Sequence, residues 1–458
     1  MCKVYKSNMS NLCTLSILQE RASLHRMKIF YYTFGCKVNQ YETENLRQKL
    51  SAAGYETTED MSDADIFIVN TCTVTAQSDH KCRQLLHRMK KASPEAVTVL
   101  TGCFPQAFEQ QAREMTGCDI VTGSSKQDIP ELIEQFLRER RRIVDIAAHS
   151  RGELFQPMCN KPSGLKTRAF VKIQDGCDQY CTYCIIPYAR GHIRSKPLDE
   201  LKTETVGLAQ GGYKEIVLTG INLCCYGKDF SDGTRLADAL ETVCSVQGIE
   251  RVRLSSMEPE MISDGDIQRM SSLQKLCPQF HLSLQSGCDK TLKRMNRKYT
   301  CDEYRQLCAK LRAAFEDCVI TTDIMVGFAG ETDEDFAQTV DFVKEIGFEK
   351  VHIFPYSVRK GTAAERFDGQ VSSAVKQQRA RELEAVCSQI RKDFLASNVG
   401  KTVEVLFEKE KGDGMHRGYT KNYTPVAVKA ADESSWRWET KTVRITGVDG
   451  DSCTGTEQ

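Results

Sequence analysis

The sequence lacks the long apolar runs of a membrane protein and the repetitive tracts of a disordered one. No segment approaches the roughly 18 consecutive apolar residues of a spanning helix, and residues 1–27 hold no apolar stretch typical of a signal peptide. Glycine and proline number only 30 and 11 among 458 residues, which excludes collagen-like chains. We therefore expect a soluble, cytoplasmic protein that makes no membrane contact.

The chain also carries no net charge. The 62 Lys and Arg residues balance 62 Asp and Glu residues, so the formal charge is zero. A nucleic-acid-binding protein usually presents a basic surface. Any such contact must therefore come from a local patch of this chain.

Cysteine, in contrast, is abundant, with 21 residues. Because thiols stay reduced in the cytosol, so many cysteines indicate metal ligation or redox chemistry rather than a disulfide framework. The odd total points the same way. Many of these cysteines are expected to be small buried hydrophobic residues with no further role.

Residues 28–145 alternate short apolar strands with amphipathic helices, which predicts a doubly wound parallel sheet. Residues 1–27 show no periodicity and are predicted to be an extension. Cys36, Cys72 and Cys103 each follow a predicted strand. Ligands bind beyond the carboxyl ends of such strands, although a cysteine there can also be buried filler.

A linker is predicted over residues 146–166, followed by a second α/β domain over residues 167–396. Six strand–helix repeats predict a partial (β/α)6 barrel, whose functional residues lie at the carboxyl ends of strands. The six predicted strands are 169–174, 215–220, 251–256, 280–285, 319–327 and 351–356. Short β segments over residues 397–450 predict a small all-β, OB-like module, and residues 451–458 are predicted to be a tail.

The run GCDQYCTYC places Cys177, Cys181 and Cys184 in one loop after the first barrel strand. Three close thiolates can hold three corners of a cubane iron–sulfur cluster and leave the fourth iron open. The alternative is a zinc site, which would need a fourth ligand such as His192.

The run CDQYCTYCIIPYARG resembles the radical S-adenosylmethionine (SAM) signature as it occurs in the methylthiotransferases. GCKVNQYE, NTCTVT and LTGC are similar to the three cysteine motifs of the N-terminal domain of that family. The resemblance implies two 4Fe–4S clusters and two SAM molecules per turnover. It assigns the cluster on Cys177, Cys181 and Cys184 to SAM cleavage, and a second cluster on Cys36, Cys72 and Cys103 to sulfur donation.

The family resemblance also suggests where SAM is held. Tyr183, just before the third cysteine of the loop, would lie against the adenine, or else simply pack in the core. Further candidates are the polar groups and a glycine at barrel strand ends, namely Ser256, Glu258, Gln285, Asp323 and Gly327. Gly327 has a tight turn as its alternative role. No catalytic side chain is indicated beyond the cluster ligands.

The C-terminal module resembles a TRAM domain, which implies RNA contact. Its charge is nearly balanced, so we expect base stacking on Tyr419, Tyr423 and Trp436. Basic runs at residues 80–91 and 138–142 are further candidates for phosphate contact, unless they are a solvated helix face and a helix end favoured by the dipole.

The resemblance, in which GCKVNQYETE and KIQDGCDQYCTYCIIPYARG are most similar to one bacterial subfamily, implies a tRNA methylthiotransferase that acts at the adenine C2 of N6-threonylcarbamoyladenosine beside the anticodon. The partners would be the anticodon stem-loop and a reductant such as flavodoxin or ferredoxin. One alternative keeps the chemistry but acts on isopentenyladenosine in tRNA or on a ribosomal protein aspartate. A second alternative is a zinc-stabilised RNA-binding protein without catalysis.

Overall fold

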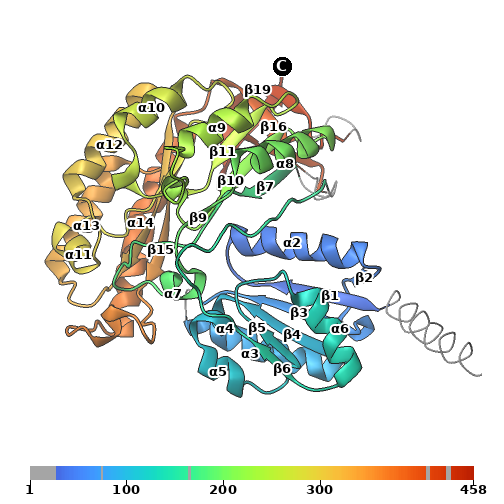
Figure 1. Cartoon of the computed structure of the whole chain (residues 1–458). Helices are drawn as coiled ribbons and strands as arrows, with labels where there is room; N and C mark the ends of the chain where they lie inside the picture. Colours follow the sequence, from blue (N-terminus) through green and yellow to red (C-terminus); the bar gives the residue numbers. More distant parts are fainter. Residues whose placement is uncertain (1–26, 74–75, 163–166, 409–412, 430–434) are drawn as a thin grey trace, which may run out of the picture. The chain divides into compact units, whose positions relative to one another are not determined.

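The computed structural model describes residues 27–73, 76–162, 167–408, 413–429 and 435–458 (Figure 1). The chain divides into two compact units. The first contains the residues up to Ser150 together with Tyr188–Gly191, and the second contains Arg151–Pro187 and His192–Gln458. Apart from Met27, the predicted extension lies outside the described residues.

The first unit is built on a six-stranded sheet of order β2-β1-β3-β4-β5-β6, in which every neighbouring pair is parallel. The sheet confirms the predicted doubly wound domain. The central strands β3 and β4 are buried along their whole length, as continuous apolar runs require when helices cover both faces. The elements are β1 (Lys28–Thr33), α2 (Lys37–Ala52), β2 (Glu56–Thr58), β3 (Ile66–Thr71), α3 (Ala76–Ala92), β4 (Val97–Gly102), α4 (Cys103–Ala107), α5 (Glu109–Glu114), β5 (Ile120–Thr122), α6 (Ile129–Glu139) and β6 (Ile143–Asp145).

Two hydrophobic cores flank this sheet. Side chains of α2 and α6 pack on one face, and side chains of α3, α4 and α5 pack on the other. Figure 1 shows α2 on one side of the strands and α3 and α5 on the opposite side. Cys82 and Cys118 are buried in the α3 core, where desolvation raises the pKa of each thiol to about 12. Both behave as the inert small hydrophobic residues that the sequence predicts.

The second unit begins with a partial barrel of two parallel sheets, of order β11-β10-β7 and β12-β13-β14-β15. All six predicted barrel strands are present, and β12 is an additional short strand. The elements are β7 (Arg168–Lys172), β8 (Gln174–Asp175), α7 (Ile186–Arg190), β9 (Arg194–Ser195), α8 (Leu198–Gln210), β10 (Glu215–Thr219), α9 (Leu236–Cys244), β11 (Arg251–Leu254), β12 (Ser256–Met257), α10 (Asp264–Ser271), β13 (Gln279–Leu282), α11 (Asp289–Arg294), α12 (Cys301–Ala314), β14 (Val319–Val326), α13 (Asp333–Ile346), β15 (Lys350–Pro355) and α14 (Ser373–Ala396). In the part of the chain that the structure describes, no helix combines the length and hydropathy needed to cross a membrane.

The same unit ends in a closed five-stranded barrel of order β16-β17-β18-β20-β19. This is the predicted OB-like module, but its extent differs from the prediction. Residues 451–458 are not a tail, because β20 pairs with both β18 and β19 and closes the barrel. Its serine, threonine and glycine composition hid the strand from sequence reasoning. The strands are β16 (Thr402–Phe407), β17 (Met415–Thr420), β18 (Pro425–Lys429), β19 (Thr440–Asp449) and β20 (Ser452–Glu457).

The aromatic side chains expected to stack bases make contacts within the second unit. Tyr419 and Tyr423 stack on each other with ring centroids 4.4 Å apart, and the Arg168 guanidinium lies about 5 Å from both rings. Arg253 lies 4.5 Å from the Tyr423 ring. Trp436 is only 7% exposed and belongs to the core of the module. The base-stacking prediction is therefore wrong for Trp436, whose ring is buried between His416 and the core of the module. Tyr419 and Tyr423 are half-buried, and for them base stacking stays a prediction.

Glu215 neutralises the two arginines under these tyrosines. Its carboxylate is fully buried and lies 3.0 Å from Arg168 Nε and 3.2 Å from Arg253 Nε. The two cations hold its pKa below the usual value even though desolvation acts in the opposite direction. The C-terminal module is thus joined to the barrel strands through a charged and aromatic contact.

We predict that Glu215→Ala destabilises the chain by about 3–5 kcal/mol, because it removes the counter-charge of the buried Arg253 and leaves Arg168 with the partly exposed Glu408. The measurement is urea unfolding followed by fluorescence. Glu408→Ala is the control, since this carboxylate also pairs with Arg168 but its side chain is 35% exposed, and its loss should cost under about 1 kcal/mol. Equal losses in the two variants would contradict the prediction.

Candidate functional site

The three cysteines of the first unit stand at the carboxyl ends of three neighbouring strands. Cys36 follows β1 and precedes α2, Cys72 directly follows β3, and Cys103 begins α4 after β4. Because β1, β3 and β4 are adjacent and parallel, their ends lie along one edge of the sheet. The fold therefore brings together residues that are far apart in sequence.

The loops carrying Cys36 and Cys72 are in close contact. Gly35 has a φ of +89°, and a Cβ at this position would lie 2.5 Å from Cys72 Cβ and 2.7 Å from Cys72 Sγ. The Asn39 side-chain amide donates hydrogen bonds of 2.9 Å to the carbonyls of both Phe34 and Thr71. Glycine is thus required beside Cys36 for two reasons, its backbone conformation and the closeness of the neighbouring thiol.

Buried cations accompany these thiols. Arg190, fully buried within the first unit, donates from Nε to Cys103 Sγ at 3.2 Å and forms a two-pronged ion pair with Glu42. Lys126 Nζ lies 2.9 Å from the same carboxylate. Desolvation raises the pKa of Cys36, and the Arg190 guanidinium opposes this rise. The site therefore supplies positive charge where thiolate ligands need it.

The second cysteine group lies in the loop between β8 and α7. Backbone hydrogen bonds hold this loop in place: Thr182 N–H donates to the Met295 carbonyl at 3.0 Å, and Ala364 N–H donates to the Thr182 carbonyl at 2.8 Å. The Asn296 side chain donates to the Tyr180 carbonyl at 3.0 Å. The three thiols are consequently presented by a backbone that is fixed from two other segments of the second unit.

Cys181 raises the pKa of Cys177, and both Cys181 and Cys177 raise the pKa of Cys184, so the three thiols are near neighbours in this loop. Desolvation is the largest cause and raises the pKa of Cys177 to about 11 and that of Cys184 to about 12. Arg297 Nη1 donates to Cys181 Sγ at 3.4 Å. Desolvated thiols of this kind become thiolates readily only beside positive charge, which a bound metal centre supplies.

The geometry does not favour zinc at this loop. His192 Nδ1 lies 2.6 Å from Asp178 Oδ1, which leaves Nε2 as its one possible metal ligand, so the case against zinc rests on the spacing of the sulfurs. A tetrahedral Zn–S4 site brings its sulfurs within about 3.8 Å of one another. The described residues contain one group of three His, Cys, Asp or Glu side chains whose ligand atoms all lie within 4.8 Å of one another. That group contains no cysteine.

The residues predicted to hold SAM lie in the second unit. Tyr183 is in the cysteine loop and packs edge-on against Phe328, with ring centroids 6.2 Å apart. Gly327 has a φ of +69° in a turn where its N–H donates to Glu331 Oε1 at 2.8 Å. Ser256 begins β12 and Glu258 follows it, whereas Gln285 lies beyond the end of β13. Asp323 lies inside β14 and not at its end as predicted.

Sequence reasoning missed the partners that hold the site residues. Arg297 is buried, pairs with Glu258 and also contacts Cys181. Desolvation raises the pKa of Glu258, and Arg297 opposes that rise. The signal was present but not used, because Asn39, Glu42 and Arg190 stand inside the same motif runs that identified the cysteines.

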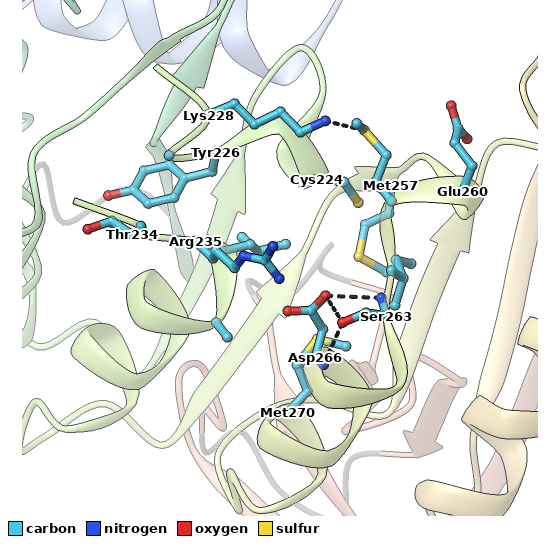
Figure 2. Close-up of a pocket in the computed structure, with 16 residues that line it drawn as sticks. Cys224, Tyr226, Lys228, Thr234, Arg235, Met257, Glu260, Ser263, Asp266 and Met270 are labelled. Atoms are coloured by element: carbon cyan, nitrogen blue, oxygen red, sulfur yellow. Dashed lines mark hydrogen bonds between the residues drawn. The ribbon is translucent and has the colours of Figure 1, made fainter. Parts of the chain in front are cut away.

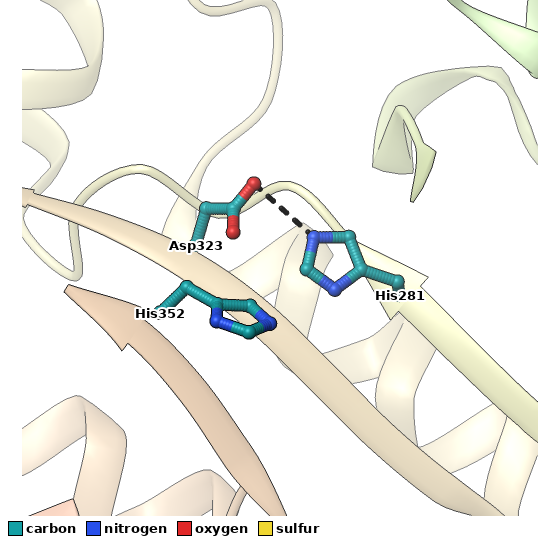
Figure 3. A group of neighbouring side chains, drawn as sticks. All are labelled: His281, Asp323 and His352. Carbon is teal, nitrogen blue, oxygen red and sulfur yellow. Dashed lines mark ion pairs between the residues drawn. The ribbon is translucent and has the colours of Figure 1, made fainter. Parts of the chain in front are cut away.

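A polar group faces the inside of the partial barrel (Figure 3). Alternate residues of β13, β14 and β15 pack against the surrounding helices, and the intervening residues His281, Asp323 and His352 therefore point inward. His281 Nε2 lies 3.2 Å from Asp323 Oδ2, and His281 Nδ1 lies 3.0 Å from Thr321 Oγ1. The three residues are intermediate or exposed, so this polar group is open to a ligand.

A cavity of about 450 Å³ lies beside the cysteine loop (Figure 2). Its lining combines the thioethers of Met257, Met261 and Met270 with charged side chains, including Arg235 and Lys228. The loop reaches the rim of this cavity, because Gln179 Nε2 donates to Glu260 Oε1 at 3.1 Å and lies 3.5 Å from Met261 Sδ. The volume suits a small molecule.

Comparison with known proteins agrees with this arrangement. Residues 28–123 match the model of Uncharacterized protein family UPF0004, and residues 171–343 match the model of the Radical SAM superfamily. The solved structure of the radical SAM methyltransferase TsrM from Kitasatospora setae, with tryptophan and aza-SAM bound, has a TM-score of 0.54 and 14% sequence identity over 72% of this chain and 73% of that chain. At this identity the likeness shows the fold alone.

Curated relatives cover almost the whole chain. The threonylcarbamoyladenosine tRNA methylthiotransferase MtaB of Bacillus subtilis (strain 168) is 37% identical over 88% of this chain and 91% of the relative. The protein of the same name from Thermotoga maritima is 39% identical over 85% and 89%. A tRNA-2-methylthio-N(6)-dimethylallyladenosine synthase from Caldicellulosiruptor saccharolyticus is 36% identical over 89% and 88%. This chain belongs to the radical SAM methylthiotransferase family, which uses 4Fe–4S clusters and SAM.

We predict that Gly35→Ala destabilises the first unit at least twice as much as Gly117→Ala. Both glycines have positive φ, which costs an alanine about 1–2 kcal/mol. A Cβ at Gly117 meets only Lys90 Cγ at 3.9 Å, whereas a Cβ at Gly35 collides with Cys72. Urea unfolding of the two variants measures the difference, and equal losses would show that Cys72 is not held against Gly35.

Proposed function

We propose that this chain inserts a methylthio group at the adenine C2 of N6-threonylcarbamoyladenosine, beside the anticodon of tRNA. The observation that carries the proposal is the combination of two cysteine groups at strand ends with a polar barrel interior. The family relationship supports the reaction class. The relatives named above include proteins named for either tRNA nucleoside at similar identity, so identity alone does not select the substrate.

The barrel interior favours the polar substrate. The threonylcarbamoyl group carries a carboxylate, a hydroxyl and urea N–H groups, whereas the dimethylallyl group is apolar. Asp323 and His352 offer polar atoms on the inner face of adjacent strands, and His281, held by Thr321, orients the Asp323 carboxylate. A site lined by such groups rejects an analogue that cannot pair with them, because the polar atoms would be left desolvated and unpaired.

Each cysteine group is proposed to hold one 4Fe–4S cluster through three thiolates. Cys177, Cys181 and Cys184 would ligate the cluster that works with SAM, and Cys36, Cys72 and Cys103 would ligate the second cluster. The strand-end positions of the first group, the desolvated neighbouring thiols of the second and an arginine beside each group support this assignment. Three ligands per cluster leave one iron of each open to a further group.

When bound, these groups supply a carbon radical that can remove the unactivated C2 hydrogen and a sulfur donor that replaces it. The side chains of this chain bind and orient rather than transfer protons. Arg297 would neutralise thiolate charge at Cys181 and fix Glu258 near the SAM site. Arg190 would do the same beside Cys103, with Glu42 holding the guanidinium in place.

The proposal includes SAM contacts for Tyr183, Ser256 and Glu258. Asp323, also predicted to contact SAM, lies inside β14 beside His281 and is assigned to the substrate instead. Gln285 and Gly327 have firmer backbone roles: Gln285 exchanges backbone hydrogen bonds with Asp323 and Met325, and Gly327 forms the turn after β14. A small acidic reductant such as flavodoxin or ferredoxin would deliver the electron. The substrate places the enzyme with tRNA in the cytoplasm.

We predict different defects in the two cysteine groups. After anaerobic reconstitution, Cys177→Ala should abolish SAM cleavage, because the cluster that works with SAM loses a ligand. Cys36→Ala should retain SAM cleavage but lose methylthio transfer, and each variant should lose about half of the iron and acid-labile sulfide. Equal loss of SAM cleavage would contradict the division of labour, and zinc without sulfide in the wild type would contradict both clusters.

We predict that His352→Leu lowers kcat/KM for threonylcarbamoyl-modified tRNA about 10-fold to 100-fold, since a hydrogen bond to a charged group contributes about 1.5–3 kcal/mol. SAM cleavage without tRNA should persist, which separates substrate recognition from loss of the cluster. Liquid chromatography with mass spectrometry of tRNA nucleosides is the measurement. The substrate assignment fails if wild-type enzyme prefers tRNA carrying the dimethylallyl group.

A further inference from the structure

Helix α3 presents an unusual concentration of unpaired cations. Lys81, Arg83, Arg88 and Lys91 are exposed, and none forms an ion pair or side-chain hydrogen bond with another described residue. His80 and His87 are exposed on the same helix. Asp79 is the single acidic residue of the helix, and Thr73 Oγ1 donates to it at 3.2 Å.

Lys90, in the same helix, has a structural role. Lys90 Nζ lies 3.1 Å from Asp119 Oδ2 and donates to the Ala96 carbonyl at 2.7 Å. Two residues of the other basic run, 138–142, have structural partners as well. Arg142 donates to carbonyls at the end of α5 and just beyond it, and Arg138 pairs with Glu134 on α6 at 4.0 Å. The cations of α3 therefore stand out against both examples.

Two aromatic rings lie beside these cations. Tyr32 and Phe34 alternate along β1, so they share one side of the strand. Their ring centroids are 4.8 Å apart, and both side chains are half-buried. Together with Lys81, Gln84 and Arg88 they line a groove of about 700 Å³.

The groove has a defined place within the first unit. Phe34 is two residues before Cys36, so the aromatic wall runs along the end of β1 toward the proposed sulfur-donating cluster. The helices α2 and α6 cover the opposite face of the sheet. Lys81 and Arg88 are two helical turns apart, about 10 Å along the axis, so they offer charge at separate points of an extended ligand.

We infer that this groove binds the backbone of the RNA substrate, with phosphates on Lys81 and Arg88 and an unstacked base or ribose against Tyr32 and Phe34. The net charge of the chain is zero, so phosphate attraction must come from a local patch such as this one. Partly exposed aromatic side chains next to cations are the combination that binds unpaired nucleotides. The identity of the RNA as tRNA depends on the proposed function.

The test uses the full-length chain with both clusters reconstituted. Lys81→Glu/Arg88→Glu is compared with Lys49→Glu/Arg138→Glu, which makes the same charge change on α2 and α6. Binding of a fluorescein-labelled full-length tRNA transcript is measured by anisotropy over a series of KCl concentrations. SAM cleavage without tRNA and thermal unfolding are recorded for each variant.

We expect the α3 double reversal to raise the Kd at least about 10-fold and to lower the slope of log Kd against log salt concentration by about 2. Tyr32→Leu should raise the Kd about 10-fold with an unchanged salt slope, because base stacking is not ionic. The control double reversal should change the Kd less than about 2-fold. SAM cleavage and thermal unfolding should match the wild type in the α3 variants.

Equal Kd changes in the α3 and control variants would overturn the inference. An unchanged Kd with slower cluster reduction by flavodoxin would also overturn it, since the patch would then dock an acidic protein. The binding measurement needs no methylthio transfer. The enzyme could therefore fail to modify threonylcarbamoyladenosine while the α3 variants still raise the Kd for tRNA as expected. That result would contradict the proposed function and support the RNA groove.

Discussion

The parallel pairing of strands is the constraint on which the rest of this structure depends. It places the carboxyl ends of all the strands of a sheet at one edge. It also requires a long crossover connection, usually a helix, between parallel neighbours. The strand-end cysteines of the first unit, the cysteine loop of the second unit and the polar group inside the barrel all follow from it. A single reversed strand would carry its cysteine to the opposite edge.

Buried charge is organised around the same edges. In the first unit, Glu42 holds Arg190 and Lys126, and Arg190 contacts Cys103. In the second unit, Glu258 holds Arg297, which contacts Cys181. Each cysteine group thus has an arginine whose position is set by a carboxylate. An unpaired buried guanidinium would be costly, so these pairs are needed whether or not a cluster is bound.

Much of the fold could be predicted from the sequence, because apolar strands and amphipathic helices alternate with few interruptions. The cysteine motifs indicated which residues converge, since each follows a strand of a parallel sheet. Other features depended on tertiary contact. No local pattern shows that Tyr419 and Tyr423 pack over Arg168 and Arg253, or that a serine- and threonine-containing segment closes a barrel as β20. Arg190 and Glu42 stand inside the cysteine motifs, but Arg297 stands outside them, and the fold alone brings it to Cys181.

The closing strand β20 has a consequence for synthesis. It pairs parallel with β18 and antiparallel with β19, so the barrel has two open edges until Ser452–Glu457 are in place. Among the strands that the structure describes, β20 is the last to leave the ribosome. The C-terminal module therefore cannot close while the partial (β/α) barrel is being translated. The unpaired edges of β18 and β19 must be protected until β20 has been made.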